Sequence, residues 1–433
     1  MSSEASNRYK TVIANVFSAE NKLKLQLKIE SSLAQVQAEL KIISQEDADA
    51  ISNAVDKVQL TRVQEIEEEI HHDLMAMVKS LAEEAGEAGE KIHYGATSTD
   101  IQDSVLALQM TRGRTLILQK LSELMDLLAE KAENNKNVAC IGRTHGQFAV
   151  PTTVGFKFAN FLFEFMLTEK MIKLVPLDLA KFSGAVGNYA SLGRMDVETK
   201  LLDQLNLSPC LISTQVVSRV VHSQFLMGLA LIAGVLERLS KEIRNLQRSE
   251  IGEWLEPFAS RQVGSSAMPH KRNPHKSERI SGLARIIRAN VQVGLENVAL
   301  EHERDITHSS AERIIIPESA NLTYYILDSM CKLISGLEIN ERRIRNNLMQ
   351  ALSNAQSEQI LSRLTEVIGR QKGHELLTKH VIADEYKISV LKDQEIIRII
   401  PIEELEKIFS TVEVGLATQK VEMVIQAYKG GEY

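Results

Sequence analysis

Cysteine, proline and long apolar runs are all scarce in this chain of 433 residues. Its 3 cysteines, Cys140, Cys210 and Cys331, are odd in number and far apart, which argues against a disulfide framework and against a cysteine metal site. The longest apolar run, residues 225–236, is too short to span a bilayer and indicates a buried helix segment. The first seven residues lack the pattern of a signal peptide, so we expect a cytoplasmic protein with no membrane partner.

The overall charge is also modest. A formal net charge of −7 gives no reason to expect a nucleic acid or an anionic membrane as a partner. With 44% hydrophobic and 25% charged residues, the composition is that of a globular protein and excludes a disordered chain. The length exceeds what one compact core usually supports, so we expect two or three domains.

Proline is rare enough to leave long tracts for helices. Only 8 prolines occur, with none before Pro151 and none between Pro317 and Pro401. Apolar residues recur at helical spacing over residues 101–135, 225–250 and 277–300, and a further helix is predicted for residues 317–335, beginning at Pro317. Strand-like alternation is confined to short pieces such as residues 213–221. We expect an all-α fold with a central bundle of very long helices. The predicted domains are residues 1–96 (N-terminal, helical), 97–345 (central long-helix bundle) and 346–433 (C-terminal, helical).

Residues 264–274, Gly-Ser-Ser-Ala-Met-Pro-His-Lys-Arg-Asn-Pro, join small residues, hydroxyls, an ammonium group and a helix start. The small residues let backbone amides approach an anion closely. Asn273 is a good N-cap and Pro274 fits the first helical position, so we expect a helix start that presents free N–H groups to an anion. Residues 270–279 contain four cationic side chains and one carboxylate, a local excess of three positive charges. An ordinary surface turn is the alternative, but the combination favours chemistry on a carboxylate.

Two segments with histidines are further candidates. Residues 142–147, Gly-Arg-Thr-His-Gly-Gln, place His145 between flexible residues and between helical tracts. Taken alone, this segment fits a solvated loop histidine as well as a proton-transfer group. Residues 70–73, Ile-His-His-Asp, are predicted to lie within one helix, with His72 nearly opposite the apolar stripe and therefore outside the core. Adjacent histidines on a helix point in different directions, so a shared metal site is not expected.

A dense polar run covers residues 302–313, His-Glu-Arg-Asp-Ile-Thr-His-Ser-Ser-Ala-Glu-Arg. It contains two arginines, Arg304 and Arg313, and two adjacent hydroxyls, Ser309 and Ser310. Guanidinium forks and serine hydroxyls are the usual means of binding phosphate or carboxylate groups. A charged loop between helices is the alternative, and the run alone does not decide between them.

The run at 264–274 resembles, residue for residue, the signature loop of the fumarase/aspartase superfamily, whose members eliminate fumarate from a succinyl-bearing substrate. Its His-Lys-Arg-Asn-Pro ending is similar to two branches, adenylosuccinate lyase and carboxymuconate cycloisomerase. The 302–313 segment closely resembles the part of adenylosuccinate lyases that binds the nucleotide end, which favours that branch. The resemblance covers nearly the whole chain, with motifs in order from Arg8 to Arg313. It implies a homotetramer with a twenty-helix core, active sites each assembled from three subunits, and no metal or organic cofactor.

The resemblance also implies site roles. Ser265 matches the general base, and because a serine hydroxyl is a very weak base, its alkoxide needs the charge of Lys271 and exclusion of water. His145 matches the general acid, with Glu278 keeping its imidazolium form available. The implied substrate-binding residues are Arg8, Tyr9, His71, His72, Asp73, Thr97, Ser98, Gln215, Ser266, Asn273, Arg279, Arg304, Ser309, Ser310 and Arg313.

The reaction implied is β-elimination of fumarate from adenylosuccinate, giving AMP, and from the succinyl-carboxamide ribonucleotide of purine synthesis. The substrate would thus be a small nucleotide. Two alternatives remain. The chain could be a carboxymuconate cycloisomerase that acts on a muconate lactone and ignores nucleotides, or a catalytically silent relative that keeps only the helical bundle. Every position that the resemblance marks as catalytic is occupied, which speaks against the silent relative.

Overall fold

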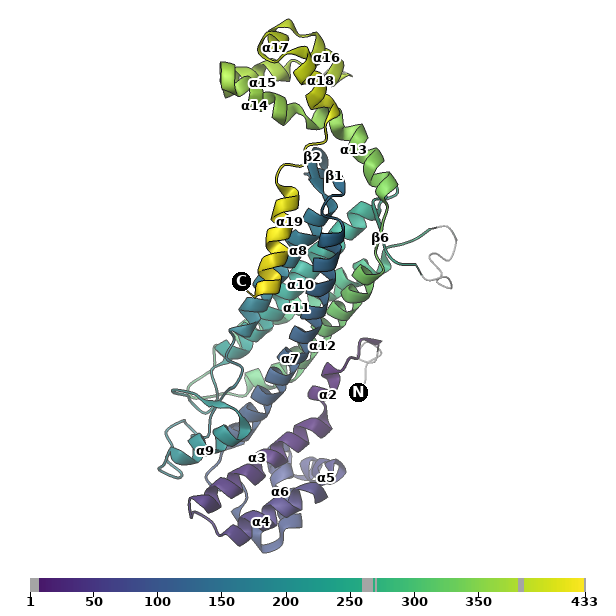
Figure 1. The fold of residues 1–433 in the computed structure, drawn as a ribbon. Coiled ribbons are helices and arrows are strands. Elements are labelled where there is room, and N and C mark those ends of the chain that lie inside the picture. Colours follow the sequence, from purple (N-terminus) through teal and green to yellow (C-terminus); the bar gives the residue numbers. More distant parts are fainter. Residues whose placement is uncertain (1–7, 259–267, 269–270, 381–384, 432–433) are drawn as a thin grey trace. The chain divides into compact units, whose positions relative to one another are not determined.

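Helices make up almost all of the regular structure in the computed structural model, which describes residues 8–258, 268, 271–380 and 385–431 (Figure 1). The predicted all-α class is confirmed. The helices are α2 Ile13–Val16, α3 Ala19–Glu39, α4 Gln45–Ala54, α5 Leu60–Ile70, α6 Asp73–Ala85, α7 Ser98–Asn134, α8 Val154–Lys173, α9 Asp196–Leu205, α10 Arg219–Gln247, α11 His275–Glu296, α12 Thr307–Ser335, α13 Glu341–Ala355, α14 Ser357–Ile368, α15 Arg370–Thr378, α16 Tyr386–Lys392, α17 Gln394–Ile399, α18 Ile402–Ser410 and α19 Ala417–Gly430, with 3-10 helices η1 Val55–Lys57 and η2 Gly86–Lys91.

The strands of the described residues form three small pairs. An antiparallel hairpin joins β1 Ala139–Thr144 to β2 Gln147–Thr153. The other two pairs have two residues per strand: β3 Leu179–Ala180 with β4 Ser208–Pro209, parallel, and β5 Trp254–Leu255 with β6 Glu338–Ile339, antiparallel.

The chain divides into two compact units. In unit 1 the N-terminal helices α3 to α6 surround a core that includes Leu33 and Leu74. In unit 2 the helices α14 to α18 surround a separate core that includes Leu364 and Leu405. The predicted division into domains 1–96, 97–345 and 346–433 stays a prediction. Unit 1 comprises Met1–Ser122, Thr168–Leu236 and Gly282–Asp328, and unit 2 comprises Glu123–Leu167, Glu237–Ser281 and Ser329–Tyr433.

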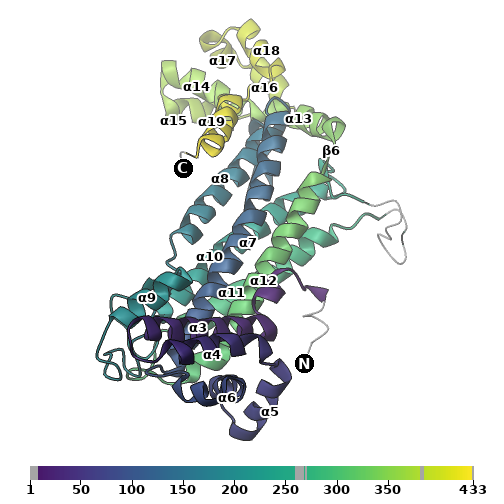
Figure 2. The same cartoon turned by 60° about the horizontal axis from the view of Figure 1, so that its bottom comes forward.

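Of the described helices, six have 20 residues or more, among them α3 with 21. The helix α7 has 37 residues, α10 and α12 have 29 each, α11 has 22 and α8 has 20. Within unit 1, the segments of α7, α10, α11 and α12 run side by side in both views (Figure 1, Figure 2). The helices predicted for residues 101–135, 225–250 and 277–300 are confirmed as α7, α10 and α11.

Two local predictions are wrong. The last long helix, α12, begins at Thr307 and contains Pro317, because a carboxylate oxygen of Asp305 accepts the N–H of Thr307 at 2.7 Å and caps the helix ten residues earlier than predicted. Residues 213–221 contain no strand. There the N–H of Val217 binds the carboxylate of Asp103 at 2.8 Å instead of a neighbouring strand, and Arg219 already begins α10.

The apolar run at 225–236 lies inside α10. By length and composition this helix could cross a membrane, but 61% of its most apolar window is buried inside the protein. The side chains of Phe225, Leu229 and Leu236 are fully buried. This burial is what the sequence predicted for a core helix.

A fully buried ion pair fixes the start of α7. Lys181 pairs with Asp100, and both side chains are 0% exposed. The same carboxylate accepts the N–H of Thr97 at 2.8 Å and of Ser183 at 3.2 Å, while Lys181 also donates to the carbonyl of Gly184 at 3.2 Å. The pair therefore ties the first turn of α7 to residues 181–184.

Replacing Lys181 by methionine should lower the free energy of unfolding by about 3 kcal/mol, because it leaves a carboxylate buried without its cation. Urea unfolding of the two proteins measures the difference. The double variant Lys181→Met with Asp100→Asn should recover part of the loss, since the uncompensated charge is then gone. Equal urea midpoints for wild type and Lys181→Met would contradict the argument.

Candidate active site

The segment at residues 70–73 is a break between two helices, and the prediction of one continuous helix is wrong. His71 ends α5 in the left-handed conformation, with φ of 54°. The ring Nδ1 of His72 accepts the N–H of Met75 at 3.2 Å and so caps α6, which begins at Asp73. Both histidines are exposed. Within the described ranges no group of three or more His, Cys, Asp or Glu side chains could hold a metal ion.

Asp73 is the centre of a charged cluster in unit 1. Its carboxylate accepts from Lys22 Nζ at 3.2 Å, from Arg313 Nη2 at 2.7 Å and from Gln102 Nε2 at 3.1 Å. Burial by itself would raise the pKa of Asp73, but the charges of Lys22 and Arg313 outweigh it and hold this pKa below its usual range. The ionised carboxylate thus joins the starts of α3, α6 and α12, which are far apart in the sequence.

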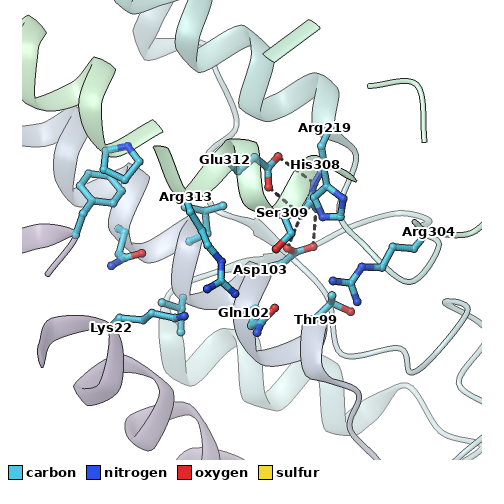
Figure 3. Close-up of a pocket in the computed structure, with 15 residues that line it drawn as sticks. Lys22, Thr99, Gln102, Asp103, Arg219, Arg304, His308, Ser309, Glu312 and Arg313 are labelled. Carbon is cyan, nitrogen blue, oxygen red and sulfur yellow. Dashed lines mark hydrogen bonds and ion pairs between the residues drawn. The ribbon is translucent and has the colours of Figure 1, made fainter. Parts of the chain in front are cut away.

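Two cavities meet at this cluster. One encloses about 160 Å³ and is lined by Lys22, Asp103 and His308 among others (Figure 3). The other encloses about 250 Å³. Four residues line both cavities: Gln102, Arg304, Ser309 and Arg313. Most of the substrate-binding residues predicted in unit 1 line the larger cavity: His71, His72, Asp73, Ser98, Arg304, Ser309 and Arg313.

Gln215 lies next to this site through Arg304. Arg304 Nη1 donates to the side-chain oxygen of Gln215 at 3.0 Å, and its buried Nε has no hydrogen-bond partner among the described residues. The hydroxyl of Thr99 donates to the carbonyl of Gln215 at 2.5 Å. Arg304 is therefore held by one side chain and keeps donors for a ligand.

Four other predicted residues of unit 1 do not line either cavity. The ring of Tyr9 packs edge to face on Tyr325 with centroids 5.0 Å apart, and Arg8 beside it is exposed. The N–H of Thr97 is capped by Asp100, and Ser310 is exposed on α12. Their assignment as substrate contacts rests on the resemblance alone.

Sequence reasoning missed most residues of the smaller cavity, among them Asp103, Arg219 and Glu312 as well as His308 and Lys22. His308 is 1% exposed, and its Nδ1 has no hydrogen-bond partner in the described part of the chain. Burial and the nearby charge of Arg219 lower the pKa of His308, so its ring is neutral at pH 7. The buried side chains of His308, Glu312 and Ile316 recur every fourth residue, a helical signal that could have found it. Lys22 carries no such signal, because it reads as an ordinary lysine on a helix surface.

His145 occupies the tip of the β1–β2 hairpin in unit 2, so the prediction of a plain loop between helical tracts is wrong. Thr144 pairs with Gln147, and the two residues between them, His145 and Gly146, have φ of 54° and 78°. Positive φ at both positions is typical of a type I′ turn. The His145 side chain is exposed at this tip.

The base of the hairpin is anchored by charge. Arg143 donates to both carboxylate oxygens of Glu253, at 2.5 and 3.2 Å, and Glu253 is 1% exposed. Asn347 Nδ2 donates to the same carboxylate at 2.8 Å. A bidentate, buried pair of this kind fixes direction as well as distance, so the turn projects from a rigid support.

Only part of the predicted signature loop is described. Ser265 and Ser266 lie outside the described residues. Lys271 is exposed, and its N–H binds the carbonyl of Met268 at 3.0 Å. Among the remaining predicted residues, Glu278 is exposed in the first turn of α11, and Asn273 and Arg279 are half-buried.

The start of α11 differs from the prediction of free N–H groups. The buried carboxylate of Glu256 accepts the N–H of Ser277 at 2.8 Å and that of Lys276 at 3.3 Å, and it also binds the hydroxyl of Ser277. The sequence could not show this, because Glu256 lies nineteen residues before the first residue of the helix. A protein carboxylate thus already occupies the positive end of this helix.

Comparison with known proteins gives concordant matches. Residues 5–288 match a family model described as "Lyase". An adenylosuccinate lyase of Pyrococcus horikoshii is 41% identical over 95% of this chain and 94% of its own length, and one of Methanocaldococcus jannaschii is 39% identical over 96% and 94%. Among solved structures, a fumarate lyase from Mesorhizobium sp. BNC1 aligns with a TM-score of 0.87 at 28% identity over 95% of this chain and 97% of that one. A 3-carboxy-cis,cis-muconate lactonizing enzyme from Pseudomonas putida aligns with a TM-score of 0.88 at 26% identity, covering 100% of both.

Proposed function

Since the chain belongs to the adenylosuccinate lyase family, we propose that it eliminates fumarate from adenylosuccinate to give AMP, and from the succinyl-carboxamide ribonucleotide by the same reaction. One observation in the structure carries the proposal: seven predicted substrate residues from three separate segments line one cavity. The lactonizing relative is only 26% identical, against 41% for the adenylosuccinate lyase, which disfavours the cycloisomerase alternative.

The nucleotide end is proposed to bind at the charged cluster of unit 1. Arg304 and Arg313 offer guanidinium donors to the phosphate, and the hydroxyl of Ser309 lies in the same shared wall. Lys22 adds a third cation near Arg313, since both bind Asp73. A nucleotide phosphate, which carries nearly two negative charges at neutral pH, suits this excess of cations.

The elimination itself needs a base, an acid and stabilisation of negative charge. In the proposed mechanism Ser265 removes the proton from the carbon next to a carboxylate, and Lys271 stabilises the dianionic aci-carboxylate that results. Ser266 and Asn273 hold the substrate there, and Arg279 binds a carboxylate. His145 then protonates the departing nitrogen, with Glu278 favouring its charged form. Proton transfer and electrostatics suffice for each step.

We also propose a homotetramer in which three subunits complete each site. The substrate-binding residues of the two cavities lie in unit 1, whereas His145, Lys271 and Glu278 belong to unit 2. Unit 1 exposes apolar side chains on its long helices, more than a lone subunit should leave in water. These exposed residues of unit 1 are Met171, Val220, Met227, Leu231 and Ile286, with Leu174 directly after the end of α8.

Purified protein should release fumarate from adenylosuccinate, and the reaction should be visible as a fall in ultraviolet absorbance. Treatment with a chelator should leave the rate unchanged, because no step uses a metal. The matched substrate control is a muconate lactone, which should not react. Turnover of the lactone without fumarate release from the nucleotide would support the cycloisomerase instead, and no turnover of either would support a silent relative.

A further inference from the structure

A second charged cluster, distinct from that at Asp73, is buried at the wall of the smaller cavity. Its members are Asp103, Arg219, His222 and Glu312, and each is less than one tenth exposed. Arg219 holds Asp103 through two bonds, from Nη1 and Nη2, both of 2.9 Å. Arg219 also contacts Glu312, with Nη2 to Oε2 at 3.3 Å and Nε to Oε1 at 3.2 Å. His222 Nδ1 lies 2.9 Å from the same Oε1. We call these four residues the Arg219 network.

The Arg219 network joins three segments that are distant in sequence. Asp103 lies on α7, one turn after Ser98, and Arg219 begins α10, four residues after Gln215. Glu312 lies on α12, three residues after Ser309 and next to Arg313. Each segment therefore carries residues proposed to bind substrate, and one guanidinium connects all three (Figure 3).

Backbone bonds make the connection to the Gln215 segment rigid. Arg219 Nη1 donates to the carbonyl of Val217 at 2.8 Å, and Asp103 accepts the N–H of Val217 at 2.8 Å. The guanidinium and the carboxylate thus clamp one peptide unit between them. Gln215, two residues earlier, is the residue that holds Arg304 at 3.0 Å.

Asp103, His222, Glu312 and the Nη atoms of Arg219 bond to one another or to backbone, whereas Arg219 Nε makes only the 3.2 Å ion-pair contact with Glu312. Burial by itself would raise the pKa of Asp103 and of Glu312, but Arg219 and His222 outweigh it and keep both carboxyl groups ionised. Buried charged groups are stable only when each is paired with an opposite charge. Removing one member of the network therefore leaves another charge unpaired and shifts the remaining side chains. The network is thus occupied internally and acts on substrate through other residues.

We propose that Arg219 and Glu312 are positioning residues, which hold Ser309 and Arg313 on α12 in register with Gln215 and Ser98 for binding of the nucleotide end. The inference rests on the proposed function of these cavities. It assigns the network to substrate affinity, while the chemistry belongs to Ser265 and His145. A purely structural network would affect unfolding and leave the affinity of the folded protein unchanged.

The test is Glu312→Gln, which keeps shape but turns one acceptor oxygen into a donor beside Arg219 or His222. The KM for adenylosuccinate and the dissociation constant of AMP should each rise about tenfold, while kcat changes much less. The matched control is Asp393→Asn in unit 2, which alters a carboxylate that binds His380 at 2.9 Å and should leave KM unchanged. Thermal unfolding of both variants reports their structural cost.

A KM and an AMP affinity within twofold of wild type in folded Glu312→Gln would overturn the inference. Equal rises in KM for Glu312→Gln and Asp393→Asn would also overturn it, because the effect would then be general. If Glu312→Gln does not fold, His222→Gln is tested in its place. Its KM for adenylosuccinate should rise about threefold, and an unchanged KM would refute the inference. Failure of the proposed function is a separate result, seen when wild-type protein releases no fumarate.

Discussion

Replacement of Ser265 by alanine should lower kcat for fumarate release on the order of 10⁴-fold, the largest effect that we expect. No other group is proposed to take the proton from the carbon next to the carboxylate, which is a weak acid. Alanine removes the oxygen and leaves the volume of the side chain almost unchanged. The dissociation constant for adenylosuccinate should therefore stay within a few-fold of wild type, and equilibrium binding to the variant measures it directly.

The control for Ser265→Ala is Ser410→Ala. Ser410 is an exposed residue at the end of α18, and its hydroxyl donates only to the carbonyl of Lys407 at 3.1 Å. This change should leave kcat unaltered. A Ser265→Ala protein that keeps more than one tenth of wild-type turnover would refute the assignment of the base.

Replacement of His145 by asparagine should lower kcat by about 10³-fold with little change in KM, the second largest effect. Asparagine is the informative choice because His145 has φ of 54°, a conformation that asparagine tolerates and that alanine adopts at a cost of about 1 kcal/mol. Asn-Gly is also a favoured pair for this type of turn, so the hairpin should persist. The variant thus removes proton transfer and keeps the backbone.

Mixing His145→Asn with Ser265→Ala tests the proposed sharing of sites. If three subunits complete each site, some mixed tetramers contain a site with both the intact histidine and the intact serine, and part of the activity should return. Dissociation and reassembly of the two variants, followed by the fumarate assay, measures this. Mixtures that stay as inactive as their components would argue for sites contained in one chain.

The long helices could be predicted from the sequence because their signals are local. The apolar period along residues 101–135 and the absence of proline suffice for α7, and the same reasoning finds α10 and α11. The start of α12 was misplaced because Pro317 was taken as a first-turn residue, whereas the capping carboxylate of Asp305 lies further upstream. Both signals are local, and in this helix the capping carboxylate marks the start while the proline is accommodated inside it.

The sequence could indicate which segments line the candidate site where they carry a motif, but it could not show residues that come together only through contacts in space. The 302–313 run and the 70–73 segment resemble known binding segments, and the structure brings them to one cavity. The Arg219 network has no motif, since Asp103 and Glu312 are more than two hundred residues apart. For the same reason the sequence could not predict that Glu256 caps α11 or that Lys22 pairs with Asp73.

Asp73 gives the cations of the candidate site an internal counterion. Because its carboxylate already binds Lys22 and Arg313, the nucleotide phosphate proposed to bind there would have to displace this carboxylate from the two cations. Such an exchange favours a dianion over a monoanion. Only a doubly charged group can replace the ion pairs that both cations lose when they separate from Asp73. On the proposed function, the pairing with Asp73 would also hold both cations in place when no substrate is bound.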